Sequence, residues 1–311
     1  IHLRFFVQHK EPKVDRADLS PAVWPDNPEL EWCPPGHGDI YAALVTSGTL
    51  DALLAAGIRY AFVSNADNLG AVIDKTILGY FAQNRFPFMM EVADRTEMDK
   101  KGGHLALQDG RFLLRESAQC PDQDTAAFQD IRRHRFFNTN NLWLNLASLQ
   151  KTLAAQNDRL GLPLICNRKT VDPRDPASTP VYQLETAMGS AIGVFEGAAA
   201  LRVSRTRFAP VKKVDDLLAV RSDAYVLTDD FHIEPVQEQP VMVVLDGRTT
   251  KFVQDLDACF PYGPPSLVDC ARLAIRGDVR FGRGVVCRGE VTLVNEGDAP
   301  LFIADGALVQ G

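Results

Sequence analysis

The polar segment at residues 64–70, S-N-A-D-N-L-G, carries the residue types best suited to chemistry. It follows the apolar run 60–63, which predicts a buried parallel strand, and it precedes a helix expected to begin at residue 70. Open α/β sheets bind ligands in loops beyond the carboxyl ends of their strands. Asp67 could hold a divalent cation there, and Asn65 could form amide hydrogen bonds with a ligand. The alternative is a helix cap, the usual role of Asx residues between a strand and a helix.

Three further polar loops follow predicted strands or turns. Residues 34–39 (P-P-G-H-G-D) predict a rigid turn that allows close backbone approach. Residues 138–141 contain three asparagines and precede a helix expected over 142–155, and residues 210–213 precede a helix expected over 214–221. In a doubly wound sheet these loops converge at one rim, so we predict a single ligand site.

The elements that position these loops follow from apolar periodicity and turn signals. Helices are expected over 50–56, 70–84 and 182–196, the last with an apolar stripe that suits core packing. Strands are expected over 1–7, 86–92, 162–166 and 202–208. An Asp-Gly turn at 109–110 predicts a hairpin over 104–115.

The composition changes toward β structure from Val241 onward. Short apolar pairs separated by glycine corners in residues 275–286 suggest a parallel β-helix. We therefore predict an α/β domain over residues 1–240 and a β domain over residues 241–311.

Composition and charge exclude several classes of function. The 311 residues are 46% hydrophobic and 23% charged, with a net charge of -7, so we expect a globular protein and no nucleic-acid partner. No apolar run approaches the ~20 residues of a membrane span, so no membrane partner is expected. Six dispersed cysteines without a CxxC pair favour a reduced, cytoplasmic location. Ile1 opens directly in a strand-like run, and we expect residues to be missing upstream of it.

Six motifs together resemble one known family. They are EWCPPGHGD, FVSNADNLGA, KGG, FFNTNNLW, QLETAMGSAI and RFAPVKKVDDLL, and the similarity extends over residues 5–311. In this order they resemble the UTP–glucose-1-phosphate uridylyltransferases (UDP-glucose pyrophosphorylases) of the kind found in eukaryotes. The resemblance implies a doubly wound, mixed-sheet, GT-A-like nucleotidyltransferase domain followed by a left-handed parallel β-helix.

The resemblance also implies the reaction and its partners. Family members make UDP-glucose and pyrophosphate from UTP and glucose-1-phosphate, with Mg²⁺ as the cofactor. The sugar phosphate attacks the α-phosphorus in line, so the protein contributes mainly positioning and charge neutralisation.

The nucleotide side of the implied site consists of five residues. Gln8 matches the glutamine that reads uracil, and Gly36 and His37 match the turn that packs on the base and approaches the phosphates. Asp67 matches the metal ligand and Lys212 the lysine that contacts phosphate, which makes these two the catalytic candidates. Without the family, a strand-end surface residue is an equally good interpretation of Gln8. The alternative for His37 is a structural turn histidine. For Lys212, a solvated lysine at a helix start would be the better interpretation.

The sugar side of the implied site consists of Asn65, Gly103, Glu116, Asn138 and Asn140. Carboxylates, amides and backbone groups are the usual partners of vicinal hydroxyls. The alternative for the asparagines is helix capping.

The chain departs from the family pattern in two places. Lys213 stands where the family often has a small polar residue. The glycine-rich loop that cradles the UTP phosphates in the family does not occur in this sequence, so we expect activity in the parent protein rather than in this segment alone. Two other functions stay open: a relative that acts on another sugar phosphate such as an N-acetylhexosamine phosphate, and a catalytically silent sugar-nucleotide binder. A homo-oligomer formed through the β-helix is a further expectation.

Overall fold

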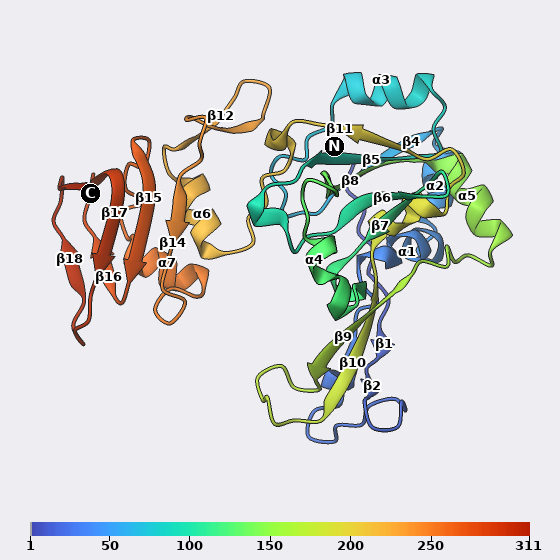
Figure 1. Ribbon diagram of the computed structural model, residues 1–311, viewed down its shortest axis with the longest axis horizontal. Coiled ribbons are helices and arrows are strands. Elements are labelled where there is room, and N and C mark those ends of the chain that lie inside the picture. Colours follow the sequence, from blue (N-terminus) through green and yellow to red (C-terminus); the bar gives the residue numbers. More distant parts are fainter. Residues whose placement is uncertain (1) are drawn as a thin grey trace. The chain divides into compact units, whose positions relative to one another are not determined.

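The computed structural model describes residues 2–311 and has a mixed α/β architecture with several sheets (Figure 1). The chain divides into two compact units, one formed by residues 2–65 and 73–205 and the other by residues 66–72 and 206–311. This division differs from the boundary expected near residue 240. The reason is that α6 (Val214–Arg221) buries Leu218 in the same hydrophobic core as Leu256 and Leu267.

The main sheet of the first unit has six strands, with the long strand β8 (Phe136–Asn145) at its centre. Strands β4 (Tyr60–Val63) and β5 (Phe88–Asp94) both pair antiparallel with β8, so they run parallel to each other. Helix α3 (Lys75–Gln83) connects β4 to β5, and Asp74 caps it by accepting hydrogen bonds from its first turn. The predicted strand–helix–strand unit is confirmed, although the helix begins five residues later than expected.

Further strands of the first unit complete its main sheet, and three helices complete its hydrophobic core. Strand β11 (Ala199–Arg202) adds parallel to β5, and β6 (His104–Gln108) forms the predicted hairpin with β7 (Arg111–Arg115). At the hairpin tip Asp109 and Gly110 have φ of 50° and 77°, as a tight two-residue turn requires. Three helices bury apolar side chains against the sheet: α1 (Ile40–Thr46), α2 (Thr49–Ala55) and α5 (Leu146–Ala155).

The segment 138–141 is part of strand β8, so the prediction of a loop there was wrong. Buried Glu91 of β5 organises its polar residues. The Glu91 carboxylate accepts hydrogen bonds from Asn141 Nδ2 (3.0 Å) and Trp143 Nε1 (2.8 Å), and the Glu91 carbonyl accepts one from Thr139 Oγ1 (2.8 Å). Because a neighbouring strand satisfies these groups, a polar run can stay in a buried strand, and α5 begins only at Leu146.

The predicted helix over 182–196 is also wrong. Residues Pro180–Thr186 form β10, which pairs antiparallel with β9 (Leu164–Thr170) and β2 (Val14–Asp15) in an arm below the main sheet (Figure 1). A 3₁₀ helix, η6 (Met188–Gly193), follows. Long-range strand pairing overrides the helical spacing of the apolar residues here.

Two other predicted strands differ in the structure. Residues 2–7 form no strand, and Ile1 lies outside the described residues. In place of a strand over 202–208, β11 ends at Arg202 and a short 3₁₀ helix, η7 (Arg205–Arg207), follows. The remaining short elements of the first unit are β1 (Glu11–Pro12), β3 (Trp32–Cys33), η1 (Pro28–Glu31), η2 (His37–Asp39), η3 (Glu97–Asp99), η4 (Ser117–Gln119), η5 (Asp122–Asp124) and α4 (Thr125–Phe128).

The second unit is dominated by parallel strands, as the change in composition predicted. One sheet has the order β14 (Met242–Val244), β15 (Cys270–Arg276), β17 (Val286–Val294), β19 (Leu308–Gln310), and all its pairs are parallel. A second parallel pair joins β16 (Val279–Phe281) to β18 (Leu301–Ile303). Helix α7 (Val253–Cys259) and the β12 (Tyr225–Leu227)–β13 (Ile233–Pro235) hairpin complete the unit. The β-helix itself stays a prediction.

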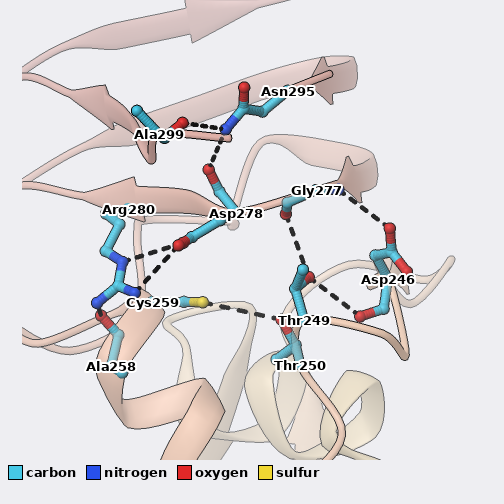
Figure 2. Close-up of polar contacts among 10 residues, drawn as sticks. All are labelled: Asp246, Thr249, Thr250, Ala258, Cys259, Gly277, Asp278, Arg280, Asn295 and Ala299. Carbon is cyan, nitrogen blue, oxygen red and sulfur yellow. Dashed lines mark hydrogen bonds and ion pairs between the residues drawn. The ribbon is translucent and has the colours of Figure 1, made fainter. Parts of the chain in front are cut away.

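A polar network stabilises one corner between these strands (Figure 2). The Asp278 carboxylate accepts two hydrogen bonds from Arg280, and Asn295 Nδ2 donates to the Asp278 carbonyl (2.7 Å) and the Ala299 carbonyl (2.8 Å). Gly277, with φ of 79°, donates its N–H to Asp246. Every group named here has a partner within the corner, which indicates a structural role.

Candidate functional site

Four of the five predicted sugar-binding residues, here called the hexose group, lie together where the β6–β7 hairpin meets β8. They are Gly103, Glu116, Asn138 and Asn140. The Asn138 N–H donates to the Gly103 carbonyl (3.2 Å), and the Asn138 side chain exchanges hydrogen bonds with Asn140 through Nδ2 (2.8 Å) and Oδ1 (2.9 Å). A methyl group on Gly103 would lie 2.6 Å from Oε1 of Glu116, so the Glu116 carboxyl group could not keep this position beside a larger residue.

Glu116 is poised for a ligand. Its carboxyl group makes no hydrogen bond or ion pair with a described residue, and burial raises its pKa to about 7. A shielded carboxyl group without a partner is costly unless a ligand hydroxyl pairs with it. The fifth predicted residue, Asn65, follows β4 by two positions in the same unit, and no hydrogen bond joins its side chain to the hexose group.

Two of the three predicted base-binding residues, Gly36 and His37, lie in one turn, here called the base turn (residues 35–38), and the third, Gln8, bonds to it. Gln8 donates a hydrogen bond from Nε2 to the Gly36 carbonyl, and the Thr186 N–H donates to the Pro35 carbonyl (2.9 Å). Gly36 has φ of 81°, and a methyl group there would lie 2.6 Å from the Thr186 carbonyl oxygen. The turn therefore packs backbone against backbone on the end of β10.

His37 has a defined protonation state in this turn. Its Nδ1 accepts a hydrogen bond from the Met188 N–H (2.9 Å), and desolvation lowers the pKa of the ring. A neutral imidazole that accepts at Nδ1 carries its proton at Nε2. His37 can therefore offer an N–H donor to a nucleotide, and the geometry gives no sign of acid–base chemistry.

Asp67 and Lys212 lie on two adjacent segments of the second unit, here called the paired segments (residues 66–72 and 207–212). The Val211 N–H donates to the Asp67 carbonyl (2.8 Å). Asn68 joins the segments by accepting from the Ala209 N–H (2.8 Å) and donating to the Arg207 carbonyl (3.1 Å). Asn68 is therefore structural. The backbone of Asp67 pairs with Val211, the residue directly before Lys212.

The residues present fit a divalent cation at Asp67. The Asp67 Oδ1 atom is buried and has no hydrogen-bond partner. Across residues 2–311 no group of three or more His, Cys, Asp or Glu residues could hold a metal ion by itself. One carboxylate completed by phosphate oxygens and water is the usual Mg²⁺ arrangement in nucleotide sites, and it suits this donor set.

The two neighbouring lysines have the same backbone partner. The N–H groups of Lys212 and Lys213 both donate to Asp216 Oδ2 at 2.9 Å, which caps helix α6. Both side chains are exposed and make no hydrogen bond or ion pair with a described residue. The contacts of the described residues therefore do not distinguish the two lysine side chains.

Sequence reasoning missed the role of residues 186–189, which it assigned to a helix. Thr186 and Met188 hold the base turn, and Gly189 packs on the hexose group, where a methyl group would lie 2.8 Å from Asn138 Nδ2. The only sequence signal was the motif QLETAMGSAI itself.

In the described residues no helix has the length and apolar character needed to cross a membrane.

Comparison with known proteins agrees with these features. A family model described as UTP–glucose-1-phosphate uridylyltransferase matches residues 1–288. The chain is 40% identical over 313 residues to the potato (Solanum tuberosum) UTP–glucose-1-phosphate uridylyltransferase, covering 99% of this chain and 64% of that protein. It is 39% identical over 312 residues to the Saccharomyces cerevisiae protein of the same name, covering 100% of this chain and 62% of the yeast protein. The chain therefore spans somewhat less than two thirds of the length of these relatives.

Solved structures show the same relationship. The Leishmania major UDP-glucose pyrophosphorylase, described in open and closed structures, matches with a TM-score of 0.86 and 49% identity over 97% of this chain and 67% of that chain. A Trypanosoma brucei structure described as UDP-glucose phosphorylase matches with a TM-score of 0.84 and 47% identity over 97% of this chain and 68% of that one. The motifs, the fold and these matches lead to one conclusion: the chain belongs to the UTP–glucose-1-phosphate uridylyltransferase family.

Proposed function

We propose that the protein containing this chain is a UTP–glucose-1-phosphate uridylyltransferase, which forms UDP-glucose and pyrophosphate. The observation that carries the proposal is the pairing of the Asp67 backbone with Val211, because it joins a residue with a buried, unpartnered carboxylate oxygen to the residue directly before Lys212. A site that binds phosphates in a protein of net charge -7 needs such local cation binding. The names of the relatives in potato, yeast and Leishmania point to the same reaction.

The hexose group would hold the sugar of glucose-1-phosphate. Asn138 is 5% exposed and is fixed by its bonds to Gly103 and Asn140, so its amide is already oriented before a ligand arrives. Glu116 would pair with a sugar hydroxyl, and Asn65 would contact the sugar phosphate. Prior orientation reduces the entropy lost on binding and places the sugar phosphate for in-line attack.

The base turn would bind the uracil end of UTP. Gln8 would read the base edge, Gly36 permits close backbone approach, and His37 supplies an N–H donor from Nε2. These residues position the nucleotide, while Lys212 neutralises charge on the phosphates.

Mg²⁺ held by Asp67 would neutralise phosphate charge during nucleotidyl transfer. Asp67 would bind it through the free Oδ1 atom, and Lys212 would contact the phosphates.

The test is pyrophosphate release from UTP with a panel of sugar-1-phosphates, using the parent protein and the 311-residue chain. Asp67→Ala should reduce Mg²⁺-dependent turnover about 10²–10³-fold, by analogy with loss of a single electrostatic contact. Near-normal turnover of this variant at saturating Mg²⁺ would exclude the metal role. If an N-acetylhexosamine phosphate outperforms glucose-1-phosphate, the sugar assignment is wrong.

Lys212→Ala should weaken UDP-glucose binding about 10–150-fold, the effect of losing one charged hydrogen bond. Lys213→Ala is the matched control and should have little effect. Calorimetric titration with UDP-glucose and with uridine measures both, and uridine binding should not change because uridine has no phosphate. Equal, small effects of the two substitutions would contradict a phosphate role for Lys212.

The parallel strands after residue 240 support a further part of the proposal. They would be coils of a left-handed β-helix that forms a C-terminal domain of a cytoplasmic protein. Leu301, Phe302 and Leu308 in its last strands are 39%, 72% and 54% exposed, and a second copy could cover them. Sedimentation of wild type and Phe302→Ser tests this, since only a homo-oligomer formed there would dissociate.

A further inference from the structure

A cluster of two arginines and two histidines, here called the Arg–His cluster, lies directly behind the hexose group. Arg95 is 7% exposed and His104 is fully buried. Arg95 Nη1 lies 3.4 Å from His104 Nδ1, and Arg115 Nη1 lies 3.5 Å from His104 Nε2 and 3.3 Å from His134 Nε2. The two imidazole rings stack with centroids 4.1 Å apart, against Phe128.

The hydrogen-bond geometry favours the neutral form of both histidines in this arrangement. Arginine only donates, so each contact needs an imidazole nitrogen that accepts, and a neutral ring has one such nitrogen. The consistent assignment has His104 accepting from Arg95 at Nδ1 and His134 accepting from Arg115 at Nε2. Protonation of either ring removes an acceptor and adds a positive charge between two guanidinium groups.

The charged groups around the cluster also disfavour protonation of the two histidines. Arg133 also acts on His134 and lowers its pKa, while Asp130 is the one carboxylate that raises it. Asp99 faces away from the rings because its carboxylate accepts from Arg205 Nη1 (2.7 Å) and from Thr96. Burial, His134, Arg95 and Arg115 together lower the pKa of His104 to about 3.

Arg95 connects this cluster to the loop that ends at Gly103. Its Nη2 donates to the carbonyls of Asp99 (3.2 Å) and Lys100 (2.8 Å), and its Nη1 donates to the carbonyls of Phe128 and His134 (both 3.2 Å). The Arg95 guanidinium therefore hydrogen-bonds to two segments, one containing residues 99–100 and the other containing residues 128–134.

The two strands of the hairpin carry this connection to the hexose group. His104 and Arg115 are cross-strand partners, and each is covalently next to a member of the hexose group, Gly103 or Glu116. Movement of the cluster would therefore shift the Gly103–Glu116 pair.

We propose that Arg95 and His104 are positioning residues for the Gly103–Glu116 pair, and that protonation of the Arg–His cluster releases this pair and weakens hexose binding. The inference rests on the proposed function, since it regulates the same site. Neither residue touches substrate: both act through the backbone of residues 99–103 and through the hairpin.

The first experiment needs no ligand. Hydrogen exchange of residues 97–104 is measured in the 311-residue chain at about pH 7.5 and about pH 5, after correction for the intrinsic exchange rate. Acid should raise exchange there in wild type, and Arg95→Met should raise it at both pH values, with partial rescue by Arg95→Lys. The double variant His104→Gln/His134→Gln keeps amide acceptors that do not titrate, so its exchange should not respond to acid. Unchanged exchange in Arg95→Met would overturn the proposal.

The second experiment measures UDP-glucose binding by calorimetry over the same pH range. Arg95→Met and acidification of wild type should each weaken it about tenfold or more, whereas Arg95→Met should leave uridine binding unchanged. Because Glu116 also titrates, the measurement is repeated in Glu116→Gln, where the loss on acidification to about pH 5 should persist. His232→Gln removes a partly exposed histidine of the second unit and should behave as wild type.

The outcomes separate the two levels of inference. An acid response that disappears in Glu116→Gln, or equal loss of uridine and UDP-glucose affinity in Arg95→Met, would overturn the positioning role. If wild type fails to bind UDP-glucose at about pH 7.5, the proposed function fails, and the exchange experiment still decides whether the cluster holds the loop.

Discussion

At the scale of single residues, each of the two units has a predicted site residue with a side-chain oxygen that finds no hydrogen-bond partner among the described residues. Asp67 Oδ1 is buried without a hydrogen bond, and the Glu116 carboxyl group is shielded beside Gly103 with no partner among the described residues. Such groups reduce stability unless a ligand satisfies them. Asp67 lies in the family motif FVSNADNLGA, and groups without a protein partner are expected in a binding site rather than in a purely structural loop.

Glu116→Gln should therefore stabilise the free protein and weaken sugar binding. The folded-state pKa of about 7 lies above the ordinary 4.5, so ionising Glu116 lowers the free energy of unfolding as pH rises from about 4.5 to 7. Glutamine removes this cost, up to about 3 kcal/mol at pH 8. Urea unfolding at about pH 5 and about pH 8 should show the gain only at the higher pH, alongside weaker UDP-glucose binding. A stability change equal at both pH values would contradict the burial of this carboxyl group.

At the scale of elements, the end of β10 supports both halves of the first unit's site. Thr186 and Met188 bond to the base turn, and Gly189 makes room for Asn138. Close approach at these points depends on glycine, because a side chain at Gly36 would meet the Thr186 backbone and one at Gly189 would meet the Asn138 side chain.

Gly38→Ala tests this packing. Its new methyl group would lie 2.4 Å from Thr186 Oγ1 and 2.8 Å from Thr186 Cβ, so the base turn must move. We expect uridine binding to weaken about tenfold or more, with a loss of stability of about 1–3 kcal/mol.

Gly79→Ala is the matched control, since Gly79 lies in α3 with open space around it. It should raise stability by about 0.5–1 kcal/mol and leave uridine binding unchanged. Normal binding by Gly38→Ala would show that the turn does not contact the base.

At the scale of the whole molecule, two compact units have separate hydrophobic cores. All three tryptophans, Trp24, Trp32 and Trp143, belong to the first unit, so tryptophan fluorescence reports on that unit alone. Circular dichroism reports on both. This distribution allows the stability of each unit to be measured in the intact chain.

Leu273→Ala should destabilise the second unit selectively. Leu273 is fully buried in the core of the parallel sheet, and truncation of such a residue costs about 2–5 kcal/mol. We expect an earlier transition in circular dichroism with no shift in the tryptophan transition. Leu227→Ala, at a position 65% exposed, should change neither. A parallel shift of both signals in Leu273→Ala would show that the two units unfold together.

The sequence by itself determined those elements whose signals are local. The Asp-Gly hairpin at 104–115, the helix at 214–221 and the change to β structure after residue 240 depend on turn chemistry and periodicity within a few residues. The family motifs are contiguous stretches of sequence, so the sequence alone also indicated the family.

Only the tertiary structure decided the features that depend on partners distant in the chain. Segment 138–141 is a buried strand because Glu91 satisfies its side chains, and 180–186 is a strand because β9 pairs with it. Asp67 lies beside Val211, the residue before Lys212, because residues 67–69 form backbone hydrogen bonds with residues 209–211. In each case the free energy comes from hydrogen bonds between segments tens of residues apart, which no local pattern encodes.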